Sequence, residues 1–206
     1  MKKLLRDNGL TLVLLGLFCL FWSLQAFCGW QVFNDEETLH GMPAVPFTSY
    51  LSSGHFWQAT GENWESEFLQ MGAYVVLTAF LFQRGSAESK DPDAPQGDHP
   101  PEDAVRFGFI RRNSLSLVLL LFFVAAFMVH AVGGLVEENA KREDNGQPPE
   151  TLTDFLSGSE FWFQSFQNWQ SEFLAVLSIV VLTIFLRQHG SPESKAVSDP
   201  NSKTGA

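Results

Sequence analysis

Cysteine and basic residues are scarce in this chain of 206 residues. Its two cysteines, Cys19 and Cys28, share one apolar run, and the helical rise places them about 13 Å apart, too far for a disulfide. No Cys/His spacing typical of a metal site is present, so we expect no metal and no cofactor. Lys and Arg number 13 against 23 acidic residues and are scattered, which excludes a basic nucleic-acid-binding surface.

Apolar residues are concentrated in four runs, at 10–30, 68–82, 115–135 and 173–186. This pattern excludes a soluble enzyme with one mixed core. A bilayer core of about 30 Å requires roughly 20 helical residues, so the first and third runs are long enough to span it. The second and fourth runs reach that length only by including the polar segments 63–67 and 168–172. We predict an all-α integral membrane protein with four transmembrane helices, at about 9–31, 64–83, 114–136 and 169–187.

The chain matches itself without a gap at an offset of 105 positions. Its strongest match is NWESEFL at 63–69, which returns as NWQSEFL at 168–174. Each repeat holds two spans, so both helical hairpins face the same way, as parallel repeats. The predicted organisation is repeat 1 at 1–90, a disordered cytoplasmic linker at 91–105, repeat 2 at 106–195 and a disordered tail at 196–206.

Orientation follows from the distribution of Lys and Arg around the spans. Eleven of the 13 basic residues fall on one side, and the two exceptions are Lys141 and Arg142. Because basic residues mark the cytoplasmic side, we place both termini in the cytoplasm and two acidic hairpin tips outside. The run of the first span is too long for the apolar region of a signal peptide, so we expect it to be retained.

The helices are predicted to continue beyond the bilayer as packed extracytoplasmic necks. Glu137 and Glu138 stand four residues before Lys141 and Arg142, a spacing that stabilises a helix, and Asn145-Gly146 supplies a stop. Mostly aromatic residues along the second return helix, from Trp162 to Val176, then recur at steps of four and three, a packing seam, and the same spacing runs from Trp57 through Gly61 to Met71 in the first. The neck-packing residues are Trp57, Trp64, Trp162 and Trp169.

Four motifs carry a family resemblance: RDNGL at 6–10, HGMP at 40–43, NWESE at 63–67 and QRGSAESK at 83–90, each with a counterpart in the other repeat. With them the chain resembles an uncharacterised bacterial integral-membrane family, a domain of unknown function. The resemblance covers almost the whole chain. It implies a four-span protein of the bacterial inner membrane and no activity, ligand or catalytic residue.

The helical rise brings polar residues of each hairpin to the same depth, just inside the outer boundary of the bilayer. Gln25 is level with Glu67, and His130 is level with Glu172. One turn above each carboxylate lies an amide side chain, at Asn63 and Asn168. Ionisable groups at membrane depth point to a cation or proton site on the pseudo-two-fold axis. The alternative, which we favour, is a set of interhelical hydrogen bonds that locks the hairpins.

Catalytic patterns are missing. No nucleophile elbow and no phosphate-binding glycine loop is present, so we expect no enzyme activity. The Gly-Ser-x-Glu-Ser-Lys segments at 85–90 and 190–195 are either docking sites or helix stops at the glycine. We therefore predict a structural or interaction protein acting through its acidic necks, in contact with the lipid bilayer and with a second copy or another membrane protein. The alternative is a small cation- or proton-conducting protein.

Overall fold

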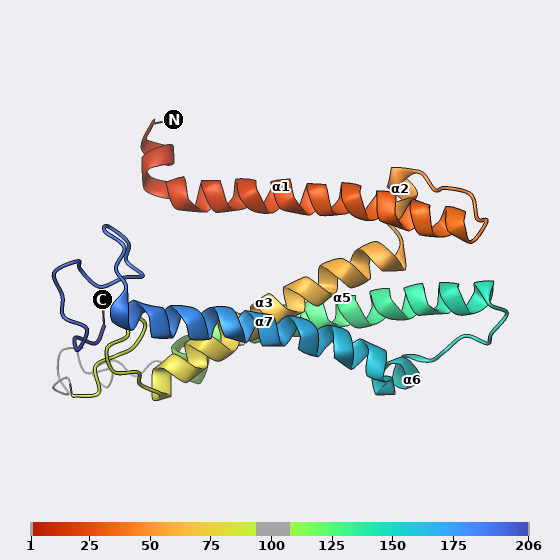
Figure 1. The fold of residues 1–206 in the computed structure, drawn as a ribbon. Helices are drawn as coiled ribbons and strands as arrows, with labels where there is room; N and C mark the ends of the chain where they lie inside the picture. Colours follow the sequence, from red (N-terminus) through yellow and green to blue (C-terminus); the bar gives the residue numbers. More distant parts are fainter. Residues whose placement is uncertain (1, 94–107, 206) are drawn as a thin grey trace. The chain divides into compact units, whose positions relative to one another are not determined.

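The computed structural model describes residues 2–93 and 108–205, and this part of the chain is all-α (Figure 1). The prediction of an all-α protein is confirmed. Its long helices are α1 (Lys2–Leu39), α3 (Gly54–Phe80), α5 (Ser114–Asp144) and α7 (Ser159–Phe185), and its short helices are α2 (Phe47–Tyr50), α4 (Phe109–Arg112) and α6 (Leu152–Ser157).

Within the described residues, three helices are long and apolar enough to cross a membrane: Arg6–Leu39, Ser114–Asp144 and Ser159–Phe185. Large apolar side chains along them, such as Leu10 and Phe21, are exposed, as expected for surfaces that lipid covers. The remaining predicted span, the second along the chain, lies on α3, which has the same length as α7. The apolar part of α3 runs from Phe68 to Phe80, which is 13 residues or about 20 Å of helix.

Local structure recurs at the 105-residue spacing found in the sequence. Helices α3 and α7 start and end 105 positions apart. The Asn34 side chain bonds both backbone groups of Val45, and the Asn139 side chain does the same to Glu150. The helix stop at Gly41 also recurs, because Gly146 has a positive φ as well.

Helix α5 continues past its apolar run, as the sequence predicts. The helix continues to Asp144, and the two ion pairs expected from the sequence form, Glu137–Lys141 at 3.4 Å and Glu138–Arg142 at 3.8 Å. The backbone N–H of Gln147 then donates to the Arg142 carbonyl, which closes the helix in the manner of a glycine stop.

The chain divides into two compact units, Met1–Thr60 with Val129–Phe155 and Gly61–Met128 with Leu156–Ala206. In unit 1, the short helix α2 places Tyr50 in an aromatic core with the buried side chain of Phe56. The Phe33 ring lies 5.6 Å from Tyr50, and Trp30 donates its indole N–H to the Val45 carbonyl. The loop after α1 is thereby fastened back onto α1.

Glycines let α3 and α5 approach each other closely within unit 1. A Cβ added to Gly54 would lie 2.5 Å from the Glu137 backbone nitrogen and 2.7 Å from the Gly133 oxygen. A Cβ on Gly133 would lie 2.5 Å from the Gln58 nitrogen. Because the obstructing atoms belong to backbone, no side-chain rotation relieves these clashes. The helices therefore cross backbone against backbone, as small residues permit in membrane proteins.

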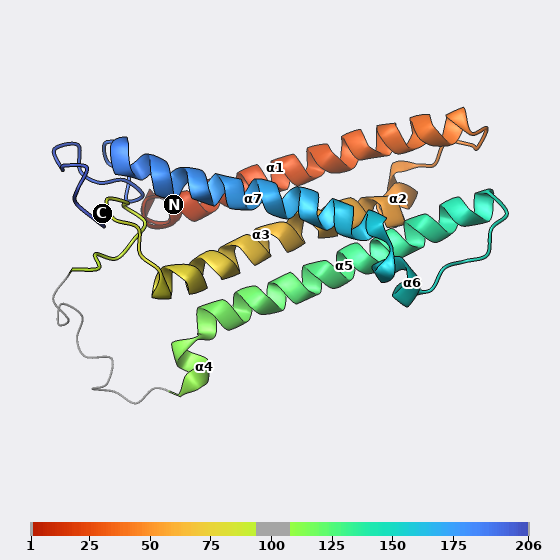
Figure 2. The same ribbon diagram turned by 60° about the horizontal axis from the view of Figure 1, so that its bottom comes forward.

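Unit 2 contains α7 and parts of α3 and α5 (Figure 2), and aromatic pairs join these helices. Phe68 of α3 lies 5.0 Å from Phe122 of α5, and Phe127 of α5 lies 5.3 Å from Phe161 of α7, measured between ring centroids. Phe161 is fully buried. Each of these pairs joins two helices that lie apart in the sequence, so the aromatic residues set the packing of the unit.

The structure describes the predicted tail but little of the predicted linker. Most of the predicted linker at 91–105 lies outside the described residues. Residues 196–205, for which the sequence predicts disorder, run in turns that contact the end of the first repeat. The Gly205 N–H donates to the Ser86 carbonyl, and the Gly85 N–H donates to the Thr204 hydroxyl. A polar sequence is ordered here because its backbone finds hydrogen-bond partners far away in the chain.

Candidate functional site

The six residues of the predicted polar cluster are divided between the two units. Gln25 on α1 is half-buried and His130 on α5 is buried, and both belong to unit 1. Four belong to unit 2: Asn63 and Glu67 are exposed on α3, and Asn168 and Glu172 are half-buried on α7. The pairing of His130 with Glu172, and that of Gln25 with Glu67, stay predictions.

Two other carboxylates of α3 bond to α7 within unit 2. Glu65 is completely buried, and one of its oxygens accepts the indole N–H of Trp169 at 3.0 Å. Glu62 accepts a hydrogen bond from the Asn168 side chain, whose amide also donates to the Gln164 carbonyl. These four residues, Glu62, Glu65, Asn168 and Trp169, are called the neck lock below. They tie α3 to α7 with two interhelical hydrogen bonds.

Trp169 is anchored by rings as well as by its N–H. Its ring lies 5.5 Å from Phe166 and 6.3 Å from both Trp162 and Phe123. The Trp162 indole N–H donates to the Leu156 carbonyl at 2.9 Å. Along α7 the rings of Trp162, Phe166 and Trp169 thus lie next to one another, and the indole N–H groups of Trp162 and Trp169 reach polar partners.

Glu62 and Glu65 are not marked by the internal repeat. Their counterparts 105 positions later are Gln167 and Gln170, so the two repeats differ in charge at these positions. Glu65 and Glu67 are two residues apart and thus face different sides of the helix, because side chains at that spacing are not neighbours. The difference in charge between Glu62 and Gln167, and between Glu65 and Gln170, is the sequence feature that points to these two carboxylates.

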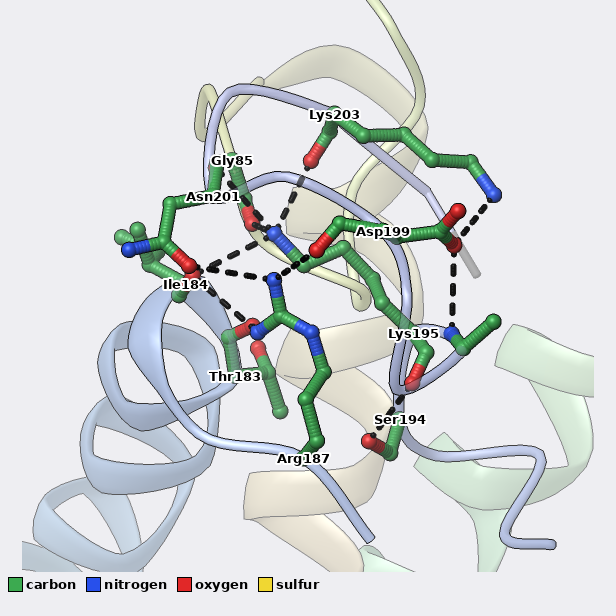
Figure 3. Close-up of polar contacts among 10 residues, drawn as sticks. Gly85, Thr183, Ile184, Arg187, Ser194, Lys195, Asp199, Asn201 and Lys203 are labelled. Carbon is green, nitrogen blue, oxygen red and sulfur yellow. Dashed lines mark hydrogen bonds and ion pairs between the residues drawn. The ribbon is translucent and has the colours of Figure 1, made fainter. Parts of the chain in front are cut away.

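The buried amine of Lys195 is the second polar centre, at the end of unit 2 (Figure 3). Its Nζ donates to four backbone carbonyls, those of Gly85, Ile184, Asn201 and Lys203. The Ile184 carbonyl is one of the last in α7, where a helix leaves its carbonyls unpaired and carries partial negative charge. Lys195 thus joins the end of α7, the turn at Gly85 and the tail.

Neighbouring charges complete this centre (Figure 3). Arg187 donates to the Asp199 carbonyl and to the Asn201 side chain, at 2.9 and 3.1 Å. Burial lowers the pKa of Lys195, and the Arg187 guanidinium lowers it further. The Lys203 ammonium, 2.7 Å from Asp199, holds the pKa of that carboxyl below its usual range. Two cations, Lys195 and Arg187, thus hold the tail by hydrogen bonds to its backbone carbonyls.

The Lys195 centre clarifies the two Gly-Ser-x-Glu-Ser-Lys segments. Gly85 and Gly190 do have positive φ values, but α3 and α7 end five residues earlier, at Phe80 and Phe185. The reading of these glycines as helix stops is therefore wrong. Each glycine lies in a turn instead, and a serine hydroxyl of the same turn accepts a backbone N–H in both copies, at 2.8 Å.

A catalytic use of Lys195 is not supported by this geometry. An amine that is fully buried and already bonded to four carbonyls has no face open to a substrate. Among the residues that the structure describes, no group of three His, Cys, Asp or Glu side chains could hold a metal ion. Both polar centres consist of contacts that hold helices and turns together.

We expect the variant Lys195→Met to release the tail. Four carbonyls would lose their shared donor, and hydrogen bonds to a charged group contribute about 1.5 to 3 kcal/mol. Amide hydrogen exchange at 196–205 should accelerate about tenfold to a hundredfold. The matched control is Lys90→Met, 105 positions earlier, where the side chain is exposed. Equal exchange in the two variants would contradict the fastening role of Lys195.

The fold and these sites together define a class. An all-α chain with three candidate membrane helices, whose exposed faces are apolar, is a multi-pass membrane protein. More particularly, the chain belongs to the family described as a domain of unknown function, DUF6766, whose model matches residues 1–206. No curated protein and no solved structure matches it.

Proposed function

We propose that this protein is a four-span protein of the bacterial inner membrane, built as two parallel hairpins with both termini in the cytoplasm. We propose further that it has a structural or interaction role, which its acidic extracytoplasmic tips carry out. The recurrence of backbone turns and side-chain hydrogen bonds at the 105-residue spacing supports the duplication. The position of the basic residues supports the orientation.

One observation carries the interaction role: acidic residues at the tips are exposed, whereas Glu62 and Glu65 of α3 are bonded to α7. The tip segment 31–53 contains three acidic residues, Asp35, Glu36 and Glu37, and no Lys or Arg. Asp35 and Glu36 in it are exposed. In the second tip, Lys141 and Arg142 are paired with glutamates of their own helix, while Asp144 is exposed.

The neck lock supports the structural alternative for the intramembrane cluster over conduction. Asn168, a member of that cluster, is engaged by Glu62, and the buried Glu65 is engaged by Trp169. A conducting site needs groups that exchange ions or protons with both sides, whereas the Asn168 amide is bonded to Glu62 and to the Gln164 carbonyl. The polar residues of the neck thus stabilise the helix pair that presents the tips.

The expected partner has a basic extracytoplasmic surface, because complementary charge accelerates and orients association. The two candidate partners are a second copy of this chain and another membrane protein. Like-charged tips of two copies repel each other, so a heterologous partner fits better. The interaction should weaken with salt, because exposed charges are screened.

The test is site-specific photo-cross-linking in native membranes. A photoreactive residue at Leu39, an exposed position beside the carboxylates, should give a discrete cross-linked product. The change of Asp35 to Asn together with Glu36 to Gln should lower its yield several-fold, as should added salt. The same residue at Val197, exposed in the tail, is the control and should not give this product. A yield that ignores both charge changes and salt would overturn the proposal.

A further inference from the structure

An apolar groove of about 550 Å³ lies in unit 2 between α3 and the segment formed by α4 and α5. Its α3 wall includes Gly72 and Val76, and its α5 wall includes Leu120. A volume of this size is typical of small-molecule sites. The groove uses none of the neck-lock residues and none of the residues around Lys195, so it is a separate feature.

The two ends of the groove differ in polarity. One end closes on the aromatic rings of Phe68, Phe123 and Phe173. The other end is lined by Phe109 together with Asn113 and Ser116, the two polar side chains of the groove. The groove therefore suits a ligand with an apolar chain and a polar end.

Two arginines stand immediately before the polar end. Arg111 and Arg112 form the last turn of α4, and both are exposed. The helix breaks after them at Asn113, whose φ of −117° and ψ of 16° depart from helical values. In the first repeat, the counterparts are Arg6 and Asp7, which pair with each other at 2.8 Å. The double positive charge is thus confined to the second repeat.

The length of the groove decides between a lipid and a helix. Asn113 and Phe123 are ten residues apart, about 15 Å along α5. That is half of a hydrocarbon core of about 30 Å, the depth of one leaflet. A partner helix would continue past the groove into the other leaflet, whereas the acyl chain of a lipid in one leaflet extends no further than this.

We propose that the groove binds one anionic phospholipid of the cytoplasmic leaflet, with an acyl chain between α3 and α5 and the phosphate at Arg111 and Arg112. The inference rests on the cytoplasmic orientation proposed above. One arginine neutralises the phosphate that all phospholipids carry. The second favours a headgroup with net negative charge over one whose ammonium it would repel.

The test is native mass spectrometry of the purified full chain, mixed with equal amounts of phosphatidylglycerol and phosphatidylcholine. One phosphatidylglycerol should be retained per chain, with a preference of about fivefold from the second arginine. The change of both Arg111 and Arg112 to Gln should abolish the preference. The control Arg84→Gln should keep it, because that arginine does not line the groove or adjoin its polar end.

A second pair of variants tests the groove itself. Gly72→Phe should fill it and lower the retention of both lipids, and Leu120→Trp should do the same if the first variant melts early. Equal retention of the two lipids by the wild type, or an unchanged preference without the arginines, would overturn the lipid site. A lipid-free dimer in the same spectra would assign the groove to a second copy. Lipid retention does not depend on the tip cross-linking, so either proposal can fail alone.

Discussion

Gly133→Ala should destabilise the protein by about 3 kcal/mol, at the upper end of the cost of adding a methyl group to a packed site. In an open helix, the same change stabilises by up to about 1 kcal/mol, because alanine restricts the unfolded chain. Here the new Cβ would lie 2.5 Å from the Gln58 nitrogen and 2.9 Å from the Trp57 carbonyl carbon. The two helix backbones would have to separate, and the neighbouring Gly54 contact would be lost with them.

Thermal unfolding in detergent, followed by circular dichroism, measures this effect. The matched control is Gly16→Ala on α1, where an added Cβ meets no atom within 4 Å. The control should melt at the wild-type temperature or above it. If Gly133→Ala also melted there, the close crossing of α3 and α5 would be wrong.

Trp169→Ala should cost about 3 to 5 kcal/mol, the range for large aromatic residues cut to alanine in a core. The variant loses ring contacts with Trp162, Phe166 and Phe123, and the buried carboxylate of Glu65 loses its indole donor. Removal of a donor to a buried charged group is costly on its own, because the acceptor is not returned to water.

Trp169→Phe separates the two contributions. It keeps a ring in the seam and removes the N–H, so we expect a loss of about 2 kcal/mol from the hydrogen bond to a charged acceptor. The control is Phe163→Ala on the same helix, where the side chain is 64% exposed and should cost within about 0.5 kcal/mol. Chemical denaturation monitored by circular dichroism measures all three. Equal stability of Trp169→Phe and the wild type would show that the Glu65 bond contributes nothing.

Features set by neighbouring residues could be predicted from the sequence. The stop at Gly146 and the ion pair of Glu137 with Lys141 depend on residues within one helical turn or one chain reversal. The ring contacts of Trp162 and Trp169 follow from steps of four and three along one helix. Local patterns of this kind contain the geometry that produces them.

Features set by distant residues could not. Lys90 and Lys195 end the same motif, yet only Lys195 is buried, because the tail supplies carbonyls to it. Likewise, Phe56 and Phe161 fill the core positions, whereas the adjacent Trp57 is 37% exposed. Two neighbouring aromatic residues point in directions about 100° apart on a helix, and only the tertiary partner decides which is covered.

Four membrane crossings with both acidic tips outside are the central claim, and cysteine labelling tests it most directly. In a chain whose Cys19 and Cys28 are replaced by alanine, single cysteines at Ser52, Ser157 and Ser202 probe the two tips and the tail. A membrane-impermeant maleimide added to intact spheroplasts should label Ser52→Cys and Ser157→Cys equally and should label Ser202→Cys only after lysis. Labelling of one tip alone, or of Ser202→Cys before lysis, would contradict the two parallel hairpins.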